Sequence, residues 1–173
     1  IFGMTVWTRQ TLLRRAVATD VPAIMEIERQ PGYEQLVGRW NEAQHFQNIS
    51  KPGYLYLVQD GSLGVPIAFA AISGLGHRDG DVLINRMIVR TPGQGIGKPF
   101  LHAIMQLAFE GAPTYRIGLR VLPDNHRALH VYRSQGFKEE RVLAHSGTLP
   151  NGRRVDLLLM SISHEDWIIR NPE

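Results

Sequence analysis

Apolar and polar positions follow two different periods along the chain, and each change of period marks a predicted element. Residues 54–60 (YLYLVQD) and 65–73 (VPIAFAAIS) are rich in β-branched and aromatic residues and flank the turn-forming GSLG, which predicts a hairpin. A third strand is predicted over 82–89 (VLINRMIV), and others are predicted over 12–17, 115–122 and 137–145. An antiparallel meander is therefore expected in the first half of the chain.

Helical spacing separates these strands. Asp20, at the position of an N-cap, and Pro22, in the first turn, predict a helix over about 21–29. Residues 31–50 have helical spacing interrupted by glycine, which predicts one or two short helices. Two longer helices are predicted over about 96–110 and 125–135.

The C-terminal part of the chain predicts one more hairpin and a short helix. Asn151 and Gly152 mark the turn of the hairpin, from which RRVDLLLMSI returns as a strand. Ser163 and Asp166 have the spacing of a capping box. The whole order predicts an α/β (α+β) domain with a single mixed, mostly antiparallel central sheet flanked by helices.

Length and composition agree with one domain. The chain has 173 residues with 43% hydrophobic and 20% charged positions, which is usual for a globular protein. Met4 is expected to be the natural start, so residues 1–3 are interpreted as a cloning remnant and residues 4–173 as the domain.

Charge, cysteine and histidine content exclude several classes of function. The net charge of +3 is scattered, which argues against a nucleic-acid partner. The absence of cysteine removes thiolate chemistry and cysteine-ligated zinc, and the seven histidines show no HExxH spacing, so no metal site is expected. No apolar run approaches the roughly 18 residues of a membrane span, so no membrane association and a cytoplasmic location are expected.

A glycine-rich segment, TPGQGIGK at 91–98, stands between a predicted strand and a predicted helix. Such a turn presents unpaired backbone N–H groups and the positive end of a helix dipole, and phosphate is their natural ligand. A P-loop is disfavoured because Pro92 and Pro99 occupy two of its required positions, and a dinucleotide fingerprint lacks its third glycine. On the glycines alone, a plain flexible turn remains open.

A second motif, NHRALHVYRSQGF at 125–137, gives the first one a specific meaning. Asn125, Ala128 and Tyr132 lie on one helical face, and Gly136 is placed to end the helix. PGQGIG followed by N-x-x-A-x-x-x-Y-x-x-x-G-F resembles the GNAT superfamily of N-acetyltransferases, and the order of elements matches over nearly the whole chain. The sequence departs from the family at Pro92, where relatives carry Gln or Arg.

The resemblance implies a GNAT-like domain whose sheet is splayed at a cleft for acetyl-CoA, the co-substrate. The main chain of Met87, Ile88 and Val89 would pair with the pantetheine arm. The diphosphate would be bound by the backbone amides of Gln94, Gly95, Ile96, Gly97 and Lys98. Asn125 would bond the pantetheine arm, with Ala128 and Tyr132 on the same face, and Lys98, Arg90 or Arg133 would meet the outer phosphate or remain solvated.

The resemblance also implies catalytic roles. Tyr132 would protonate the departing thiolate, as the family's usual general acid does. Many relatives carry Glu on the strand before the glycine loop, but no carboxylate occurs in 82–89. On that strand, strict alternation would place Leu83, Asn85 and Met87 on one face, and Ile84, Arg86 and Ile88 on the other.

Asn85 is therefore assigned to hold a water or orient the amine. Glu28 and Glu34 are alternatives that would act through water or attract a cationic substrate, against the reading that they are exposed charges. His77 and His145 lie near strand ends but are assigned no role, and His102 and His130 are expected on helix surfaces.

The implied function is an acetyl-CoA-dependent N-acetyltransferase that acts on a primary amine by direct attack on the thioester. The acceptor is left open between a small-molecule amine, such as an amino acid or polyamine, and a protein amine. The alternative is a non-catalytic acyl-CoA-binding or regulatory module, which the missing strand carboxylate favours and Tyr132 disfavours. A mononucleotide-binding protein is disfavoured by the failed P-loop spacing, and a homodimer through the C-terminal strands is left open.

Overall fold

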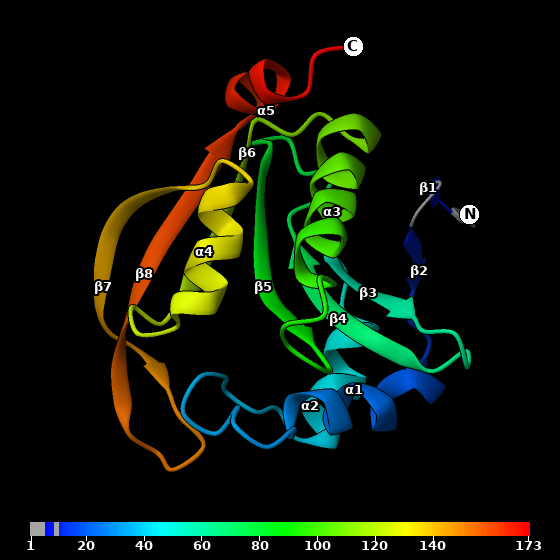
Figure 1. The fold of residues 1–173 in the computed structure, drawn as a ribbon, viewed down its shortest axis with the longest axis vertical. Helices are drawn as coiled ribbons and strands as arrows, with labels where there is room; N and C mark the ends of the chain where they lie inside the picture. Colours follow the sequence, from blue (N-terminus) through cyan, green and yellow to red (C-terminus); the bar gives the residue numbers. More distant parts are fainter. Residues whose placement is uncertain (1–5, 9–10) are drawn as a thin grey trace.

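The computed structural model describes residues 6–8 and 11–173, which form one α/β domain around a single sheet (Figure 1). The expected remnant at residues 1–3 lies outside the described residues. The described sheet has eight strands in the order β1-β2-β3-β4-β5-β6-β8-β7, and its neighbours are antiparallel except for β5 and β6. The strands are β1 (Val6–Thr8), β2 (Thr11–Arg15), β3 (Tyr54–Asp60), β4 (Pro66–Ser73), β5 (Asp81–Val89), β6 (Arg116–Val121), β7 (Lys138–Thr148) and β8 (Arg154–Ser163). The mixed, mostly antiparallel sheet expected from the sequence is confirmed.

Helices cover both faces of the sheet. The α-helices are α1 (Val21–Glu28), α2 (Glu42–Ile49), α3 (Gly97–Gly111), α4 (His126–Ser134) and α5 (His164–Arg170), and a 3₁₀ turn at Ala18–Asp20 precedes α1. Helices α3 and α4 lie on one face, where Phe100, Ile104 and Tyr132 belong to the larger apolar core (Figure 1). Helix α1 packs on the opposite face, where Ile24 and Ile27 form a second core with Phe69.

Local signals explain most helix ends. Asn41 begins α2 with a capping box, and Ser163 begins α5 by accepting a hydrogen bond from the N–H of Asp166, as its spacing predicted. Helix α4 ends at a Gly136 with φ of 100°, and the N–H of Phe137 then bonds to the carbonyl of Tyr132. The motif at 125–137 therefore fixes the length of α4.

One expectation about local structure needs correction, one is confirmed, and one strand was not anticipated. Asp20 does stand at the start of α1, but its carboxylate makes no cap bond and instead accepts from Arg14 and from the N–H of Val17. The segment 31–50 contains one short helix, α2, which confirms the expectation of one or two, and a long loop precedes it. The edge strand β1 was not anticipated, because three residues are too few to show a period.

The predicted faces of β5 are wrong because the strand contains a β-bulge. Ala71 pairs with Arg86 but Ile72 pairs with Ile84, so Asn85 is an extra residue without a partner. Beyond the bulge the alternation is shifted, and Met87 packs against the same core as Ile84. Arg86 and Ile88 consequently lie on the face covered by α1 and α2.

Candidate functional site

The sheet opens between β5 and β6. These parallel strands pair only from Asp81–Arg116 to Ile84–Leu119, whereas β5 stays paired with β4 as far as Val89. From Asn85 onward the edge of β5 that faces β6 therefore has no partner strand within the described residues, and at its end the carbonyl of Val89 accepts from the hydroxyl of Tyr33. A free strand edge of this kind can hydrogen-bond an extended ligand.

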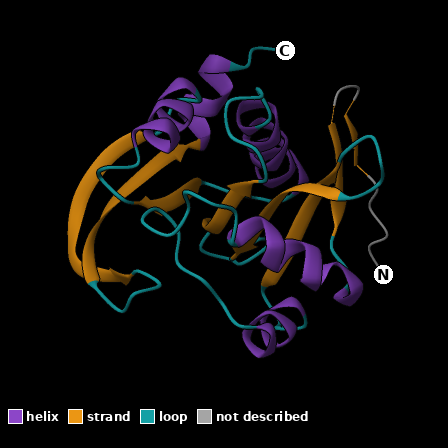
Figure 2. Cartoon of the chain, turned by 60° about the horizontal axis from the view of Figure 1, so that its bottom comes forward, coloured by secondary structure: helices purple, strands orange, loops and turns teal. Residues whose placement is uncertain are grey.

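A cleft of about 410 Å³ occupies this opening and has two different walls. We call one the helix wall, because it lies on the side of the sheet that carries α3 and α4. It consists of Ile84, Met87, Leu119, Val121, Leu122, Asn125, Ala128 and Tyr132. We call the other the loop wall, which faces the loop between α1 and α2: Leu36, Val37, Gly38, Trp40, Asn85, Arg86, Ile88, Arg120, Ser146, Gly147, Thr148, Leu149, Val155 and Leu157. Figure 2 shows the long curved β7–β8 hairpin that supplies the last six.

The glycine loop lies at the start of α3, beside the end of β5. Gly93 and Gly95 have φ of 80° and 72°, which only glycine adopts readily, and a Cβ on either would meet nothing within 4 Å. The first helical bond of α3 runs from Phe100 to Ile96, so in the described structure the N–H groups from Gln94 to Lys98 have no backbone acceptor. These donors and the helix dipole form a site suited to an anion.

Helix α4 presents two polar groups to the helix wall. Asn125 is the N-cap, and its Oδ1 accepts from the N–H of Ala128 at 3.2 Å, so its amide N–H₂ remains for a ligand. Tyr132 follows on the same helical face and is only 7% exposed. Burial raises the pKa of Tyr132 to about 12, so the hydroxyl keeps its proton at ordinary pH.

The structure brings some predicted site residues to the cleft and leaves others beside it. Asn85, Met87, Ile88, Asn125, Ala128 and Tyr132 line it, whereas Val89 and the glycine loop lie outside the lining. The side chain of Asn85 donates to the hydroxyl of Ser73 at 2.9 Å, which holds its amide in place.

The three basic candidates for the outer phosphate differ. Arg90 is paired with Glu26 at 2.7 Å, and Arg133 is paired with Glu139. Lys98 has no ion-pair partner among the described residues and is exposed next to the glycine loop. Only Lys98 is therefore free for a phosphate without breaking an existing pair.

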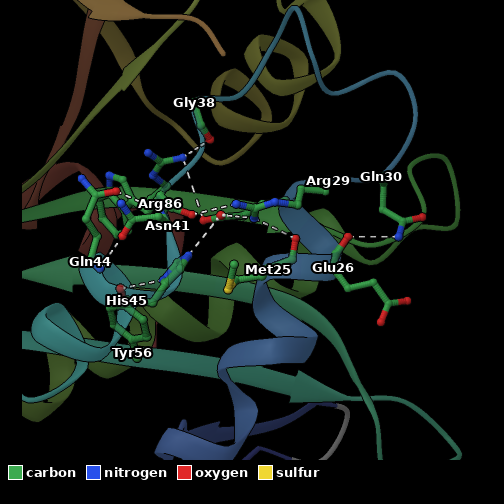
Figure 3. Close-up of polar contacts among 12 residues, drawn as sticks. Met25, Glu26, Arg29, Gln30, Gly38, Asn41, Gln44, His45, Tyr56 and Arg86 are labelled. Carbon is green, nitrogen blue, oxygen red and sulfur yellow. Dashed lines mark hydrogen bonds and ion pairs between the residues drawn. The ribbon is translucent and has the colours of Figure 1, made fainter.

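Glu28 is the centre of a buried polar cluster behind the loop wall. Figure 3 shows three residues of this cluster, His45, Tyr56 and Arg86. Its Oε2 accepts from Nε2 of His45 at 3.1 Å, and Nδ1 of His45 lies 3.0 Å from the hydroxyl of Tyr56. Burial raises the pKa of Tyr56 to about 12, so this hydroxyl stays protonated and is able to donate to Nδ1 of His45. Glu28 is thus fully buried, and the expectation of an exposed charge is wrong for it.

Arg86 connects the Glu28 cluster to the cleft. It lies over the ring of Trp40 at 4.2 Å, donates to the carbonyl of Gly38, and has its Nη1 4.0 Å from Oε1 of Glu28. Burial lowers the pKa of Arg86, while Glu28 acts in the opposite direction. Arg86 therefore fixes the loop between α1 and α2 against β5.

Sequence reasoning missed His45 and Arg86, although one signal was present. In α1, Ile24, Ile27 and Glu28 lie on one face, so the apolar face of this helix includes a carboxylate that needs buried partners. Glu34, by contrast, is exposed and accepts from the N–H of Gly32.

The histidines singled out from sequence lie away from the cleft. His77 is exposed and paired with Asp79, His145 is exposed in an irregular part of β7, and His130 is exposed on α4. His102 is half-buried against Trp167. Over residues 6–8 and 11–173, no group of three His, Cys, Asp or Glu side chains has metal-binding geometry, and no helix is long and apolar enough to cross a bilayer.

Comparisons with known proteins agree with this geometry. The sequence model of the acetyltransferase (GNAT) family matches residues 21–137, which include β5, the glycine loop and α4. The chain therefore belongs to the GNAT acetyltransferase family.

Solved structures share the fold at low identity. The spermidine N-acetyltransferase of Vibrio cholerae in complex with CoA and spermine is 19% identical, with a TM-score of 0.77 over 93% of this chain and 99% of that one. The ribosomal-protein-S18-alanine N-acetyltransferase of Escherichia coli is 21% identical, with a TM-score of 0.73 over 89% of this chain and 94% of that one.

Proposed function

We propose that the protein is an acetyl-CoA-dependent N-acetyltransferase that transfers the acetyl group directly to a primary amine in a ternary complex. The observation that carries this proposal is the opening between β5 and β6. It has a free strand edge along one side and Asn125 and Tyr132 along the other, with the free amides of the glycine loop at its end.

Each part of the cofactor has a matching set of groups. The amides of Gln94, Gly95, Ile96, Gly97 and Lys98 would bind the diphosphate, and Lys98 would meet the outer phosphate. The edge of Met87, Ile88 and Val89 would pair with the amides of the pantetheine arm, to which Asn125 would also donate. The replacement at Pro92 removes a side-chain contact but leaves these backbone donors intact.

The chemistry needs few groups from the protein. The neutral amine attacks the thioester carbonyl, and a backbone N–H of β5 stabilises the negative charge that develops on oxygen. As the carbon–sulfur bond breaks, Tyr132 donates its proton to the sulfur, and solvent returns a proton to Tyr132 as the nitrogen loses one. The result is an amide and a free thiol.

Among the residues that the structure describes, no carboxylate lines the cleft, so we assign no direct general base there. Asn85 would orient the amine or a water that carries away its proton. The rate should therefore depend on the fraction of the acceptor that arrives as neutral amine.

Thiol release from acetyl-CoA in the presence of a panel of primary amines tests the proposal, with CoA binding followed by the shift in melting temperature. We expect amine-dependent thiol release and a shift with CoA but not with ATP. CoA binding without thiol release would favour the non-catalytic module, for which the missing carboxylate is the supporting observation. No shift with CoA would contradict both.

A further inference from the structure

The two walls of the cleft differ in charge, and this difference bears on the acceptor. Among the residues that line the cleft there is no aspartate or glutamate, whereas Arg86 and Arg120 both line the loop wall. The exposed carboxylates of Glu34 and Asp156 already accept from the N–H groups of Gly32 and His145, and neither lines the cleft.

The arginine charge in this wall is not fully neutralised. Oε2 of Glu28 is engaged by His45 and by Arg29 at 3.4 Å, and its Oε1 approaches Nη1 of Arg86 only to 4.0 Å. Arg120 is exposed on β6 and has no ion-pair partner in the described part of the chain. The guanidinium groups of Arg29, Arg86 and Arg120 thus lie in or behind the loop wall. Glu28 is the single carboxylate among them.

Arg86 is also held in a fixed orientation. Its guanidinium stacks on Trp40. Its Nη1 donates to the carbonyl of Gly38 (Figure 3). Its Nε and Nη2 make no hydrogen bond to any described residue, and the side chain is 13% exposed, at the cleft. A planar donor that is held this way and partly dehydrated binds a carboxylate well.

The rest of the loop wall is mainly apolar. Leu36, Val37, Trp40 and Leu149 face the same cleft as the two arginines. A polyamine carries several positive charges, and burying it here would bring them close to Arg86 and Arg120 without a carboxylate to compensate.

We propose that the acceptor is a small primary amine that carries a carboxylate and an apolar body. Arg86 and Arg120 bind the carboxylate, and Trp40 with its apolar neighbours packs against the body. This inference rests on the proposed function and narrows it. It also separates this chain from the Vibrio cholerae structure, whose ligands are CoA and spermine.

Matched acceptors test this assignment. Thiol release from acetyl-CoA is measured with leucine, methionine and phenylalanine, with the amide of each, and with the amine that each gives on decarboxylation. Spermidine is the polycation probe. We expect kcat/KM for the best amino acid to exceed that of its two neutral-tail counterparts and of spermidine by about tenfold or more.

Arg120→Gln identifies the group responsible, because Arg120 is exposed and its loss leaves the fold intact. We expect it to reduce kcat/KM for the amino acid by about fivefold or more and to leave that for the decarboxylated amine within about twofold. Arg78→Gln is the control, because Arg78 is exposed in the turn that precedes the start of β5. It should change kcat/KM neither for the amino acid nor for the decarboxylated amine. Arg86→Lys keeps the charge but loses the planar donor. It should lower the ratio of kcat/KM for the amino acid to kcat/KM for the decarboxylated amine.

The outcomes separate the two proposals. Thiol release that is equal or faster with spermidine or with the decarboxylated amines overturns the carboxylate assignment and leaves the transferase proposal intact. A preference for amino acids that survives both arginine variants overturns the role of Arg86 and Arg120. Absence of thiol release with every amine overturns the proposed function, and this inference with it.

Discussion

The helix wall and the loop wall use opposite means to build one cleft. The helix wall and the neighbouring glycine loop offer groups that the fold leaves without partners: the backbone amides of the loop, the edge of β5 from Asn85 to Ile88 and the hydroxyl of Tyr132. The loop wall is held in place by side chains that bind one another. Glu28, behind the wall, and Arg86, within it, are at the centre of these contacts. One wall is prepared for a ligand by local chain geometry, and the other is held in shape by long-range contacts.

This difference predicts that damage to the buried Glu28 cluster behind the loop wall lowers stability, whereas damage to the groups left free for a ligand lowers ligand binding or turnover. Substitutions on the two sides therefore need different measurements. The expected effects run from several kcal/mol for the buried charge cluster to a change in a pH profile for the tyrosine.

The largest effect is expected for Glu28→Leu. Removal of this carboxylate leaves Arg86 buried without its counter-charge and His45 without its acceptor, which should lower the free energy of unfolding by about 3–5 kcal/mol. Denaturant unfolding measures it. Glu34→Leu, which affects an exposed carboxylate in the following loop, should change stability by no more than about 0.5 kcal/mol. Equal stability of the two variants would contradict the role assigned to the cluster.

Tyr132→Phe comes next. The ring keeps its packing against Phe137, so the fold and the affinity for acetyl-CoA should remain. Because the proton donor is lost, turnover should fall by about tenfold or more, at unchanged dissociation constant. Steady-state kinetics with a separate binding titration check this. Unchanged turnover would reduce Tyr132 to a packing role.

Gly95→Ala tests the glycine loop. Alanine disfavours a φ of 72° by about 1–2 kcal/mol, so the free loop should relax and CoA should bind about tenfold more weakly. Gly64→Ala is a matched control, because Gly64 has a φ of 71° and equally open space but lies in the β3–β4 turn. Calorimetric titration should show weaker CoA binding for the first variant only. Loss of affinity in both would indicate a general effect on the fold.

The smallest effect concerns the pH dependence of turnover. A pKa of about 12 keeps the Tyr132 hydroxyl protonated well above pH 10, so the descending limb of the profile is displaced to high pH. With an acceptor amine of low pKa, turnover should stay constant within about twofold up to pH 10.5. If Tyr132 had the ordinary tyrosine pKa of about 10, only about a quarter of it would be protonated at pH 10.5, and turnover would fall by about three quarters. Such a loss would show that Tyr132 is not buried in the working enzyme.

The same contrast explains what the sequence could predict. The glycine loop, the face shared by Asn125 and Tyr132 and the turn at Gly136 are determined by neighbouring residues, and they lie where the motifs indicated. The β3–β4 hairpin and the capping box of α5 are local in the same sense.

The loop wall depends on contacts that no local pattern contains. The bulge at Asn85 arises from the pairing of β5 with β4, and it reverses the faces that strict alternation assigns to Met87 and Ile88. Arg86 meets Glu28 and Trp40 only because β5, α1 and the following loop pack together. Glu28 was expected to be exposed, although its place on the apolar face of α1 is a local signal for burial; no local signal indicates its partners.

Calorimetric titration with CoA and with pantetheine tests the central claim most directly, since only CoA carries the diphosphate. If the amides between Gly93 and Pro99 bind that group, CoA should bind about tenfold or more tightly than pantetheine, and Gly95→Ala should remove most of the difference. Equal affinity for the two ligands, or no heat with CoA, would contradict the account.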